Sequence, residues 1–199
     1  MKGVKIMTNE RKFSEVPADL LETIGTNAGM LLTEFDISTG EYDPENIIGA
    51  TSGGISFDDT PNFVDFADGI DNLPLNTMEM KHINNRTVKV SGTFISLSGA
   101  TAAYLAQGHA QTLGKKTQIV INQDVVGTDY KDIYFVTNYG ISGGAIIIKL
   151  KNALSTGGFK LSTENNNKVK AAFEFTAHYS MGNLDDSPYE VYLVEGYGE

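Results

Sequence analysis

Alternating apolar and polar residues dominate the second half of the chain and predict β-strands there. The clearest case is residues 169–181, VKAAFEFTAHYSM, in which Phe173 and Phe175 face one side while Glu174 and Thr176 face the other. Such alternation is typical of an antiparallel strand with one buried face. Other segments with strand-like patterns, separated by turns, are residues 86–97, 117–123, 132–139, 144–150, 158–163 and 189–196.

The first half of the chain has weaker patterns. A short helix is expected between Pro17 and Gly25, because the apolar residues of this stretch form a partial helical stripe. Compact apolar runs bounded by turn-like residues predict strands at 29–37 and 46–57. Paired glycines interrupt the second run and indicate a β-bulge or the close approach of another backbone.

One well-marked helix is predicted at about residues 100–113. Its apolar residues, including Leu105, recur at helical spacing, and Gly114 follows where a C-terminal cap is expected. Gly108 inside this segment costs about 1 kcal/mol relative to alanine, so the helix has to pack against the rest of the protein. About nine strands and one helix predict a mainly β fold, a β-sandwich or barrel with one flanking α-helix, in a single domain over residues 1–199.

Two segments lack a regular pattern. Residues 1–16 mix charges without any period, and they are expected to form a flexible N-terminal arm that becomes ordered only against a partner. Residues 58–80 contain two prolines and several acids, and they are expected to form a long acidic loop. A loop of this length inside a compact domain is usually functional or is ordered by a partner.

Charge is distributed unevenly along the chain, whose net charge is −10. Between Lys12 and Lys81 there are 14 carboxylates and no basic side chain. Nucleic-acid binding by counterion release needs a basic patch and is therefore disfavoured. An acidic surface can instead repel DNA, bind a cation or meet a basic partner. No apolar run approaches the ~20 residues of a membrane-spanning helix, and no signal peptide is recognisable, so membrane insertion is not expected.

The sequence contains no motif for catalysis or for binding a cofactor or metal. It has no cysteine, no nucleophile-elbow serine and no phosphate-binding glycine loop. The three histidines, His82, His109 and His178, lack the spacing of a helical zinc pair. Residues 65–72, DFADGIDN, resemble a calcium loop, but the spacing differs from that of an EF-hand. A solvated acidic loop is the favoured interpretation of this stretch.

Four stretches of the chain resemble the major tail proteins, or tail tube proteins, of long-tailed bacteriophages. They are AGMLLTEFDI (28–37), IIGATSGGISFDDTP (47–61), LKNAL (150–154) and FEFTAHYSMGNLDDSPYEVYLVEG (173–196). The resemblance implies a non-enzymatic virion protein with a tail-tube-type β-sandwich. Its subunits would form stacked hexameric rings, and hence a hollow tail tube through which double-stranded DNA passes without specific binding. Tape measure, tail-tip and tail-terminator proteins would be its partners, with assembly in the host bacterial cytoplasm.

By analogy with this family, the acidic loop and the N-terminal arm would make contacts between rings or subunits. The candidate contact residues are Phe57, Asp58, Asp59, Phe63, Asp65, Phe66, Asp68 and Asp71, and the possible docking partners are Lys115 and Lys116. Lumen-facing aspartates that repel DNA are the alternative. Docking is favoured, because the aromatic side chains of the loop fit a contact better than a wet channel wall.

Three other interpretations are kept. The first is an inner tube protein of a contractile tail or of a bacteriocin-like particle. The second is a carbohydrate-binding β-sandwich that exposes Tyr130, Tyr134 and Tyr139. The third is an enzyme, which would need a pair of carboxylates at catalytic separation in a cleft.

Overall fold

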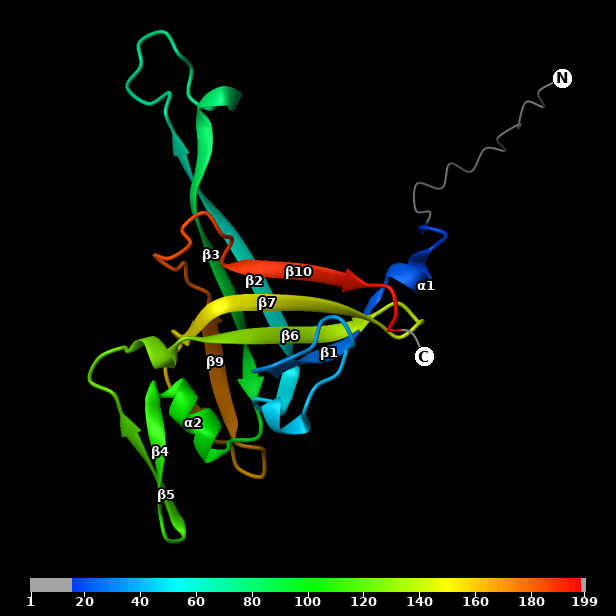
Figure 1. Cartoon of the computed structure of the whole chain (residues 1–199), viewed down its shortest axis with the longest axis vertical. Helices are drawn as coiled ribbons and strands as arrows, with labels where there is room; N and C mark the ends of the chain where they lie inside the picture. Colours follow the sequence, from blue (N-terminus) through cyan, green and yellow to red (C-terminus); the bar gives the residue numbers. More distant parts are fainter. Residues whose placement is uncertain (1–15, 198–199) are drawn as a thin grey trace, which may run out of the picture.

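The computed structural model describes residues 16–197 and consists mainly of antiparallel β-strands (Figure 1). The predicted flexible arm, residues 1–16, lies outside the described residues except for Val16. The strands are β1 (Gly25–Leu32), β2 (Thr51–Asp65), β3 (Lys81–Phe94), β4 (Gly108–Leu113), β5 (Lys116–Ile121), β6 (Lys131–Tyr139), β7 (Gly144–Ser155), β8 (Lys160–Ser162), β9 (Lys170–Thr176) and β10 (Tyr189–Val194). The α-helices are α1 (Leu20–Thr23) and α2 (Gly99–Leu105), and the 3₁₀ turns are η1 (Pro44–Asn46), η2 (Met78–Met80) and η3 (Gly127–Asp129).

Eight strands form one continuous antiparallel sheet. Its main path runs β1-β6-β7-β9-β3-β2, with β10 beside β7 and β8 beside β9, while β4 and β5 form a separate hairpin. The large sheet curls on itself: Leu32 at the end of β1 bridges to Ile47, just before β2, and the Ile48 amide donates to the Leu31 carbonyl over 3.0 Å. The described chain is therefore mainly β, and the predicted fold class is confirmed.

Strand β7 belongs to both layers of the curled sheet. Residues 144–150 pair with β6 and β10, whereas Leu154 and Ser155 pair with β9. Asn152, between these two parts, has a positive φ of 48°, and the strand turns there from one layer to the other. The main core fills the space between the layers. Its largest wholly buried side chains are Phe94, Phe175, Leu31, Leu105, Ile133, Leu150, Val88 and Val90.

A smaller apolar cluster lies on the opposite face of β1, β6 and β7. It contains Leu32, Val136 and Ile147, which alternate along their strands with residues of the main core. Phe35, in the segment between β1 and β2, and Tyr197, near the end of the described chain, pack against it. Both faces of this layer are therefore partly covered, which accounts for the nearly continuous apolar runs in β6 and β7.

The predicted helix at residues 100–113 is wrong in its second half. α2 ends at Leu105, and residues from Gly108 onward form β4, which pairs along its length with β5. A Cβ atom at Gly108 would lie 2.2 Å from the carbonyl oxygen of Val120, so only glycine permits this approach of the two backbones. Gly114, with a φ of 64°, occupies the turn of the β4–β5 hairpin instead of capping a helix.

The predicted loop at residues 58–80 is wrong for residues 58–65. These residues continue β2, and β3 begins at Lys81, so only the tip of a long hairpin is left outside the strands. The upper part of this hairpin, residues 62–85, extends beyond the body of the protein (Figure 1). Its two strands pair with each other there without a core beneath them, and therefore the sequence shows no clear alternation.

The remaining elements are close to their predicted positions. α1 is a single turn between Pro17 and Gly25, and every strand predicted after Gly114 is present. β1 begins at Gly25, four residues before the predicted strand at 29–37, and it ends at Leu32, so the prediction is wrong for residues 33–37. β2 begins at Thr51, so the predicted strand at 46–57 starts five residues too early. Gly53 and Gly54 have φ values of 85° and 86° where the pairing of β2 with β3 is irregular, as expected for a bulge.

Candidate assembly surfaces

The lower part of the β2–β3 hairpin is built into the body of the protein. The Asp59 carboxylate accepts hydrogen bonds from the Arg86 guanidinium and from the Tyr189 hydroxyl, the latter over 2.8 Å. This hydrogen bond is the main cause of a raised pKa for Tyr189. Phe57 packs on the core with its ring centroid 5.3 Å from that of Tyr189. Phe57 and Asp59, two of the predicted assembly residues, therefore have partners within their own chain.

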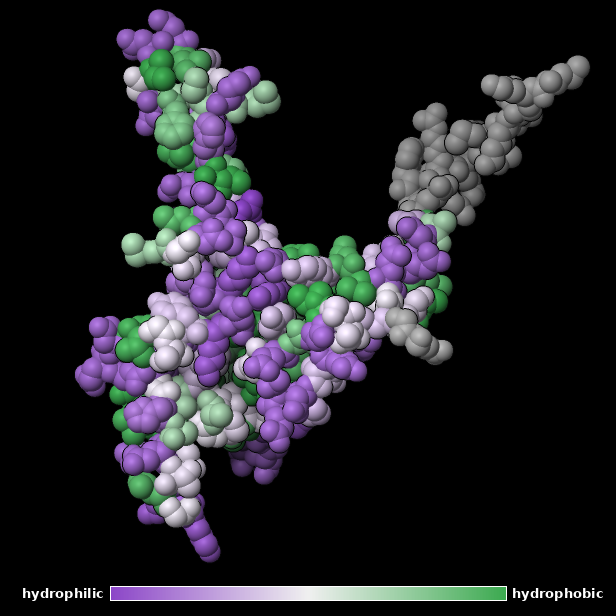
Figure 2. Space-filling view, in the orientation of Figure 1, coloured by the Kyte–Doolittle hydropathy of each residue, from purple (hydrophilic) through white to green (hydrophobic). Residues whose placement is uncertain are grey.

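The upper part of the same hairpin exposes apolar side chains. Phe63 is 56% exposed and Phe66 is 57% exposed, although Lys81 lies over the first ring at 5.1 Å and His82 lies beside the second at 5.3 Å. Hydrophobic residues are interspersed with hydrophilic ones at the end of this projection (Figure 2). The other large apolar residues exposed here are Val64, Ile70, Leu75, Met78 and Ile83.

The tip of the hairpin, residues 66–80, is shaped by its own polar groups. The Asp65 carboxylate accepts hydrogen bonds from the Asn76 amide over 2.7 Å and from the Ala67 amide over 3.0 Å, and these bonds lower the pKa of Asp65. Ala67 is buried beneath the loop, while the side chains of Asp68 and Asp71 are exposed. The DFADGIDN stretch is thus a turn held by hydrogen bonds to its own Asp65 carboxylate, and the carboxylates of Asp68 and Asp71 are exposed to solvent.

The predicted docking partners lie at the other end of the molecule. Lys115 is in the turn of the β4–β5 hairpin and Lys116 is the first residue of β5, and both are exposed. Along the longest axis of the protein, this hairpin and the tip of the β2–β3 hairpin lie at opposite ends (Figure 1). The acidic and basic candidates therefore do not meet within one chain, and they can meet only between two copies.

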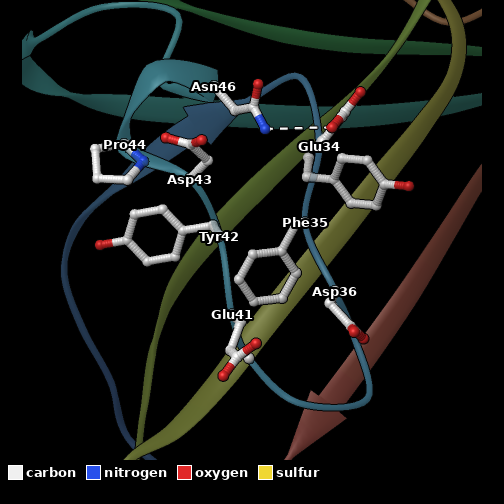
Figure 3. Close-up of a pocket in the computed structure, with 10 residues that line it drawn as sticks. Glu34, Phe35, Asp36, Glu41, Tyr42, Asp43, Pro44 and Asn46 are labelled. Carbon is white, nitrogen blue, oxygen red and sulfur yellow. Dashed lines mark hydrogen bonds between the residues drawn. The ribbon is translucent and has the colours of Figure 1, made fainter.

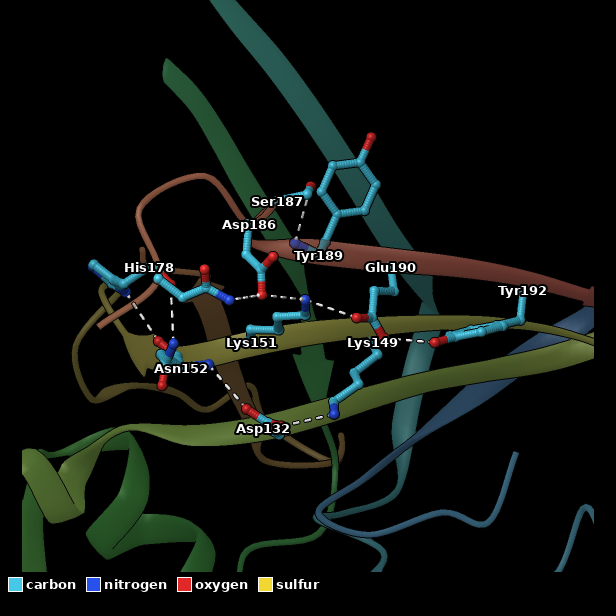
Figure 4. Close-up of polar contacts among 11 residues, drawn as sticks. Asp132, Lys149, Lys151, Asn152, His178, Asp186, Ser187, Tyr189, Glu190 and Tyr192 are labelled. Atoms are coloured by element: carbon cyan, nitrogen blue, oxygen red, sulfur yellow. Dashed lines mark hydrogen bonds and ion pairs between the residues drawn. The ribbon is translucent and has the colours of Figure 1, made fainter. Parts of the chain in front are cut away.

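A network of charged side chains joins β6, β7 and β10 (Figure 4). Lys149 contacts the Asp132 carboxylate over 3.1 Å, and Lys151 contacts the Glu190 carboxylate over 2.7 Å. The Tyr192 hydroxyl donates to Glu190 over 2.6 Å. The bond with Glu190 raises the pKa of Lys151, and the same bond, with that from Tyr192, lowers the pKa of Glu190.

Two stretches of the family resemblance meet at this network. The His178 amide donates to the Lys151 carbonyl over 3.1 Å, and the Lys151 amide donates to the Pro188 carbonyl over 2.8 Å. Asn152 adds a side-chain bond to the His178 carbonyl over 3.2 Å. These bonds join LKNAL to AHYSMGNLDDSP at the point where β7 passes from one layer of the sheet to the other (Figure 4). The two segments therefore have a structural role in the fold.

A hollow of about 1030 Å³ lies beside the segment between β1 and β2 (Figure 3). Its aromatic walls are Phe35, Tyr42 and Tyr134, with the centroids of the first two rings 6.4 Å apart. The Asp36 carboxylate accepts hydrogen bonds from the Ser38 hydroxyl and amide, which lower the pKa of Asp36. The carboxylates that line the hollow are Glu34, Asp36, Glu41 and Asp43. Sequence reasoning missed this site, although acids and aromatic residues are dense between residues 34 and 43.

The three tyrosines proposed for sugar binding do not form one platform. Tyr130 packs edge-on against the His178 ring, with centroids 5.3 Å apart, whereas Tyr134 lies under the Lys149 ammonium at 5.5 Å. Tyr130 directly precedes β6 and Tyr139 is its last residue, nine positions further along the chain, which corresponds to roughly 30 Å. Each of the three is half-buried. Of them, only Tyr134 lines the hollow of Figure 3.

The histidines are also dispersed. The His82 ring lies tilted beside that of Phe66 in the upper hairpin, His109 is an exposed residue of β4, and His178 contacts the Asn152 carbonyl through Nδ1 over 3.2 Å. Within residues 16–197, no three or more His, Asp or Glu side chains are placed to hold a metal ion. In the same part of the chain, no helix is long and apolar enough to span a membrane.

No protein-family model matches the sequence, and no curated protein matches it at a significant level. One solved structure with a partial likeness is described as "Virion of native gene transfer agent (GTA) particle". The match covers 77% of this chain and 92% of that chain, with 10% sequence identity and a TM-score of 0.42. A likeness this weak establishes neither a shared fold nor a shared role.

Proposed function

We propose that this chain is the repeating structural subunit of a viral tail tube. Copies would assemble into hexameric rings, and the rings would stack into a hollow tube. The observation that carries the proposal is the upper β2–β3 hairpin, which presents Phe63, Phe66 and Met78 to solvent although the body already has a complete core. A projecting apolar surface of this kind is typical of a contact with another protein. The sequence resemblance described above supports the tail-tube form of the assembly.

The position of the two hairpins supports an assembly that is directional. An acidic, apolar tip lies at one end of the long axis, and a basic hairpin with Lys115 and Lys116 lies at the other (Figure 1). A contact between two different surfaces is heterologous, so it does not close in a simple dimer but continues to a ring or an open stack. A tube made of many identical subunits requires contacts of this type.

The acidic charge of the chain fits both docking and passage of DNA. Duplex DNA carries one negative charge per roughly 1.7 Å of axis, so carboxylates in a channel would repel it and let it slide without specific binding. The Asp58, Asp68 and Asp71 side chains are exposed and could serve either purpose. We favour docking for Asp68 and Asp71, because they share the tip with exposed apolar residues.

The proposed role is structural and assigns no catalytic residue. Its further partners would be tape measure, tail-tip and tail-terminator proteins, in a virion tail assembled in the cytoplasm of a host bacterium. An inner tube of a contractile tail or bacteriocin-like particle would use the same contacts. The two forms differ in whether a sheath surrounds the tube.

Negative-stain electron microscopy of the purified full chain over a concentration series, with light scattering in parallel, tests the proposal. We expect rings or hollow tubes of uniform diameter at high concentration. A tail-tip or tape measure protein is added as a nucleator if the chain alone stays monomeric. A monodisperse monomer at every concentration, with and without the nucleator, would contradict the proposed function.

A second candidate function is carbohydrate binding at the hollow of Figure 3. The observation that favours it is the combination of three aromatic walls with four carboxylates, since aromatic faces stack on sugar rings and carboxylates accept hydroxyl hydrogen bonds. Calorimetric titration with a panel of oligosaccharides tests it. Binding that is lost in Tyr42→Ala would support this candidate, and the absence of any heat change across the panel would exclude the sugars tested.

A further inference from the structure

A second surface lies at the end of the molecule that carries the β4–β5 hairpin. It is a groove of about 650 Å³ between α2, β5 and the turn that follows β7, which we call the α2–β5 groove. Its lining is mostly apolar: Ala102 and Leu105 from α2, Ala106 directly after α2, Ile119 and Ile121 from β5, and Phe159. Ile121 is 63% exposed and Phe159 is 45% exposed at its rim. A hollow of this size accommodates several side chains.

The polar groups in the floor of the α2–β5 groove are already satisfied. The Gln107 side-chain amide donates to the Ser155 carbonyl over 2.6 Å, and the Ser155 hydroxyl donates to the Leu105 carbonyl over 3.1 Å. An occupant therefore gains little by offering hydrogen bonds to the floor. It gains by covering the exposed apolar area at the rim.

The charged residues in the segments that form the α2–β5 groove indicate which kind of peptide segment would bind in it. Between Leu97 and Gln123, the stretch that contains α2, β4 and β5, there are two lysines, Lys115 and Lys116, and no carboxylate. Lys160 follows Phe159 at the rim. The groove is thus an apolar surface with Lys115 and Lys116 further along the same β4–β5 hairpin and Lys160 beside Phe159, although the Glu174 carboxylate accepts a hydrogen bond from the lining residue Thr156 over 3.1 Å. The excess of lysines favours an apolar segment that carries acids.

The tip of the β2–β3 hairpin has the complementary character. Residues 66–80 include three acids and no base, and Leu75 and Met78 in this tip are 61% and 81% exposed. Because the tip and the groove lie at opposite ends of the long axis, one chain does not fill its own groove (Figure 1).

We propose that the α2–β5 groove receives the tip of the β2–β3 hairpin from a second copy of this chain. The apolar tip residues insert between α2 and β5, while Asp68 and Asp71 approach Lys115 and Lys116. This inference rests on the proposed function and specifies which surface of the neighbouring subunit accepts the hairpin. Each copy then has one tip and one groove, so the copies form a stack in which all subunits point the same way. Only the two ends of this stack have an unfilled site.

Cross-linking tests the proposal directly, since the chain contains no cysteine and engineered thiols have no background. Full-length Met78→Cys and Ile121→Cys variants are mixed, one of them carrying a mass tag, and are treated with a short bismaleimide before denaturing gel electrophoresis. Both positions are strongly exposed, so both variants should fold. The matched control replaces Ile121→Cys with Ile141→Cys, a 71% exposed residue in the turn between β6 and β7.

We expect the mixed dimer of intermediate mobility to form several-fold more in the Met78→Cys and Ile121→Cys mixture than in the control mixture. Equal yields in the two mixtures would overturn the docking, whether or not tubes form. Absence of tubes from the wild-type chain even with a nucleator, together with the specific cross-link in the cysteine-variant mixture, would contradict the tail-tube function and support the docking.

A charge swap provides an independent readout of the same contact. The Lys115→Glu/Lys116→Glu background should reduce the cross-link yield, and Asp68→Lys/Asp71→Lys in the partner variant should restore it. A yield that is unchanged by the lysine substitutions would show that these charges do not take part. A reduction without rescue would place the lysines in some other contact and overturn the assigned pairing.

Discussion

The two halves of the β2–β3 hairpin differ in what their side chains do. In the lower half, Val88, Val90 and Phe94 are wholly buried and Asp59 bonds to Arg86 and Tyr189. In the upper half, the same pair of strands exposes apolar residues such as Phe63. The backbone pairing is continuous through both halves, apart from two irregularities. The two halves of the hairpin therefore do not differ in their local strand structure.

The difference lies in whether a second layer covers the strands. Side chains of the lower half meet β9 and the layer formed by β6 and β7, so they contribute to the stability of the monomer. No layer of the same described chain packs on the upper half, and so its apolar residues add little to that stability. A surface that costs solubility without stabilising the monomer is expected to be covered by a partner.

The largest loss of stability is expected from Phe94→Ala in the lower half of the hairpin. The Phe94 ring is wholly buried and stacks on Phe173 with centroids 4.2 Å apart. Loss of this ring should lower the free energy of unfolding by about 3–5 kcal/mol, measured by urea denaturation. The matched control, Phe63→Ala in the upper half, should change it by less than about 0.5 kcal/mol. Equal losses in the two variants would show that the upper half is part of the cooperative core.

A smaller loss is expected from Asp59→Ala. This substitution removes the acceptor shared by Arg86 and Tyr189, and it should lower the free energy of unfolding by about 1–3 kcal/mol. Asp58→Ala, at the adjacent and exposed position of β2, is the control and should stay within about 0.5 kcal/mol of wild type. A neutral Asp59→Ala would mean that the base of the hairpin does not depend on this carboxylate.

The pH dependence of stability should report the ion pair between β7 and β10. Because bonds from Lys151 and Tyr192 lower the pKa of Glu190 in the folded protein, the stabilisation is present above the ordinary pKa of about 4.3 and is lost as the pH falls through the folded pKa. Glu190 is about one-third exposed, so solvent screening limits the contribution to about 1 kcal/mol or less.

Glu190→Gln should therefore flatten the acid limb of the stability curve below about pH 4.5. Lys151→Gln should flatten it only in part, because the hydrogen bond from Tyr192 to Glu190 remains, and the double variant should add nothing beyond Glu190→Gln alone. The measurement is urea denaturation at a series of pH values from neutral to acid. Additive effects of the two substitutions would show that the two groups act through other partners.

The smallest effect on stability and the clearest effect on assembly are expected from Phe63→Ser/Phe66→Ser. Both side chains are more than half exposed, so the monomer should unfold at nearly the wild-type urea concentration. Polymer formation, followed by light scattering, should be lost because the apolar contact surface is reduced. Normal tubes from this variant would remove the upper hairpin from the assembly contact.

Residue patterns predicted the strands best where one face meets the core. Phe173 and Phe175 alternate with Glu174 and Thr176 because β9 packs one face inward, and that segment is a strand as predicted. The predicted helix at residues 100–113 extends too far because apolar residues at helical spacing continue past Leu105. In the structure, the pairing of β4 with β5 overrides this local pattern.

The candidate site was predicted only in part, for a related reason. The aromatic character of Phe63 and Phe66 is visible in the sequence, and both are exposed as a contact would require. Phe57 and Asp59 have a similar sequence context, yet they pack and bond within the body. The α2–β5 groove is formed by residues from three separate segments, so no local pattern indicates it.

The sequence by itself determined a mainly β chain and an uneven distribution of charge, with most acids before Lys81 and most bases from Lys81 onward. Both properties follow from residue composition and local periodicity. Only the tertiary structure decided that β2 and β3 continue past the core, and that the acidic tip and the basic hairpin lie at opposite ends of the molecule. Strand order and the curl of the sheet set these positions, because they depend on pairing between distant segments.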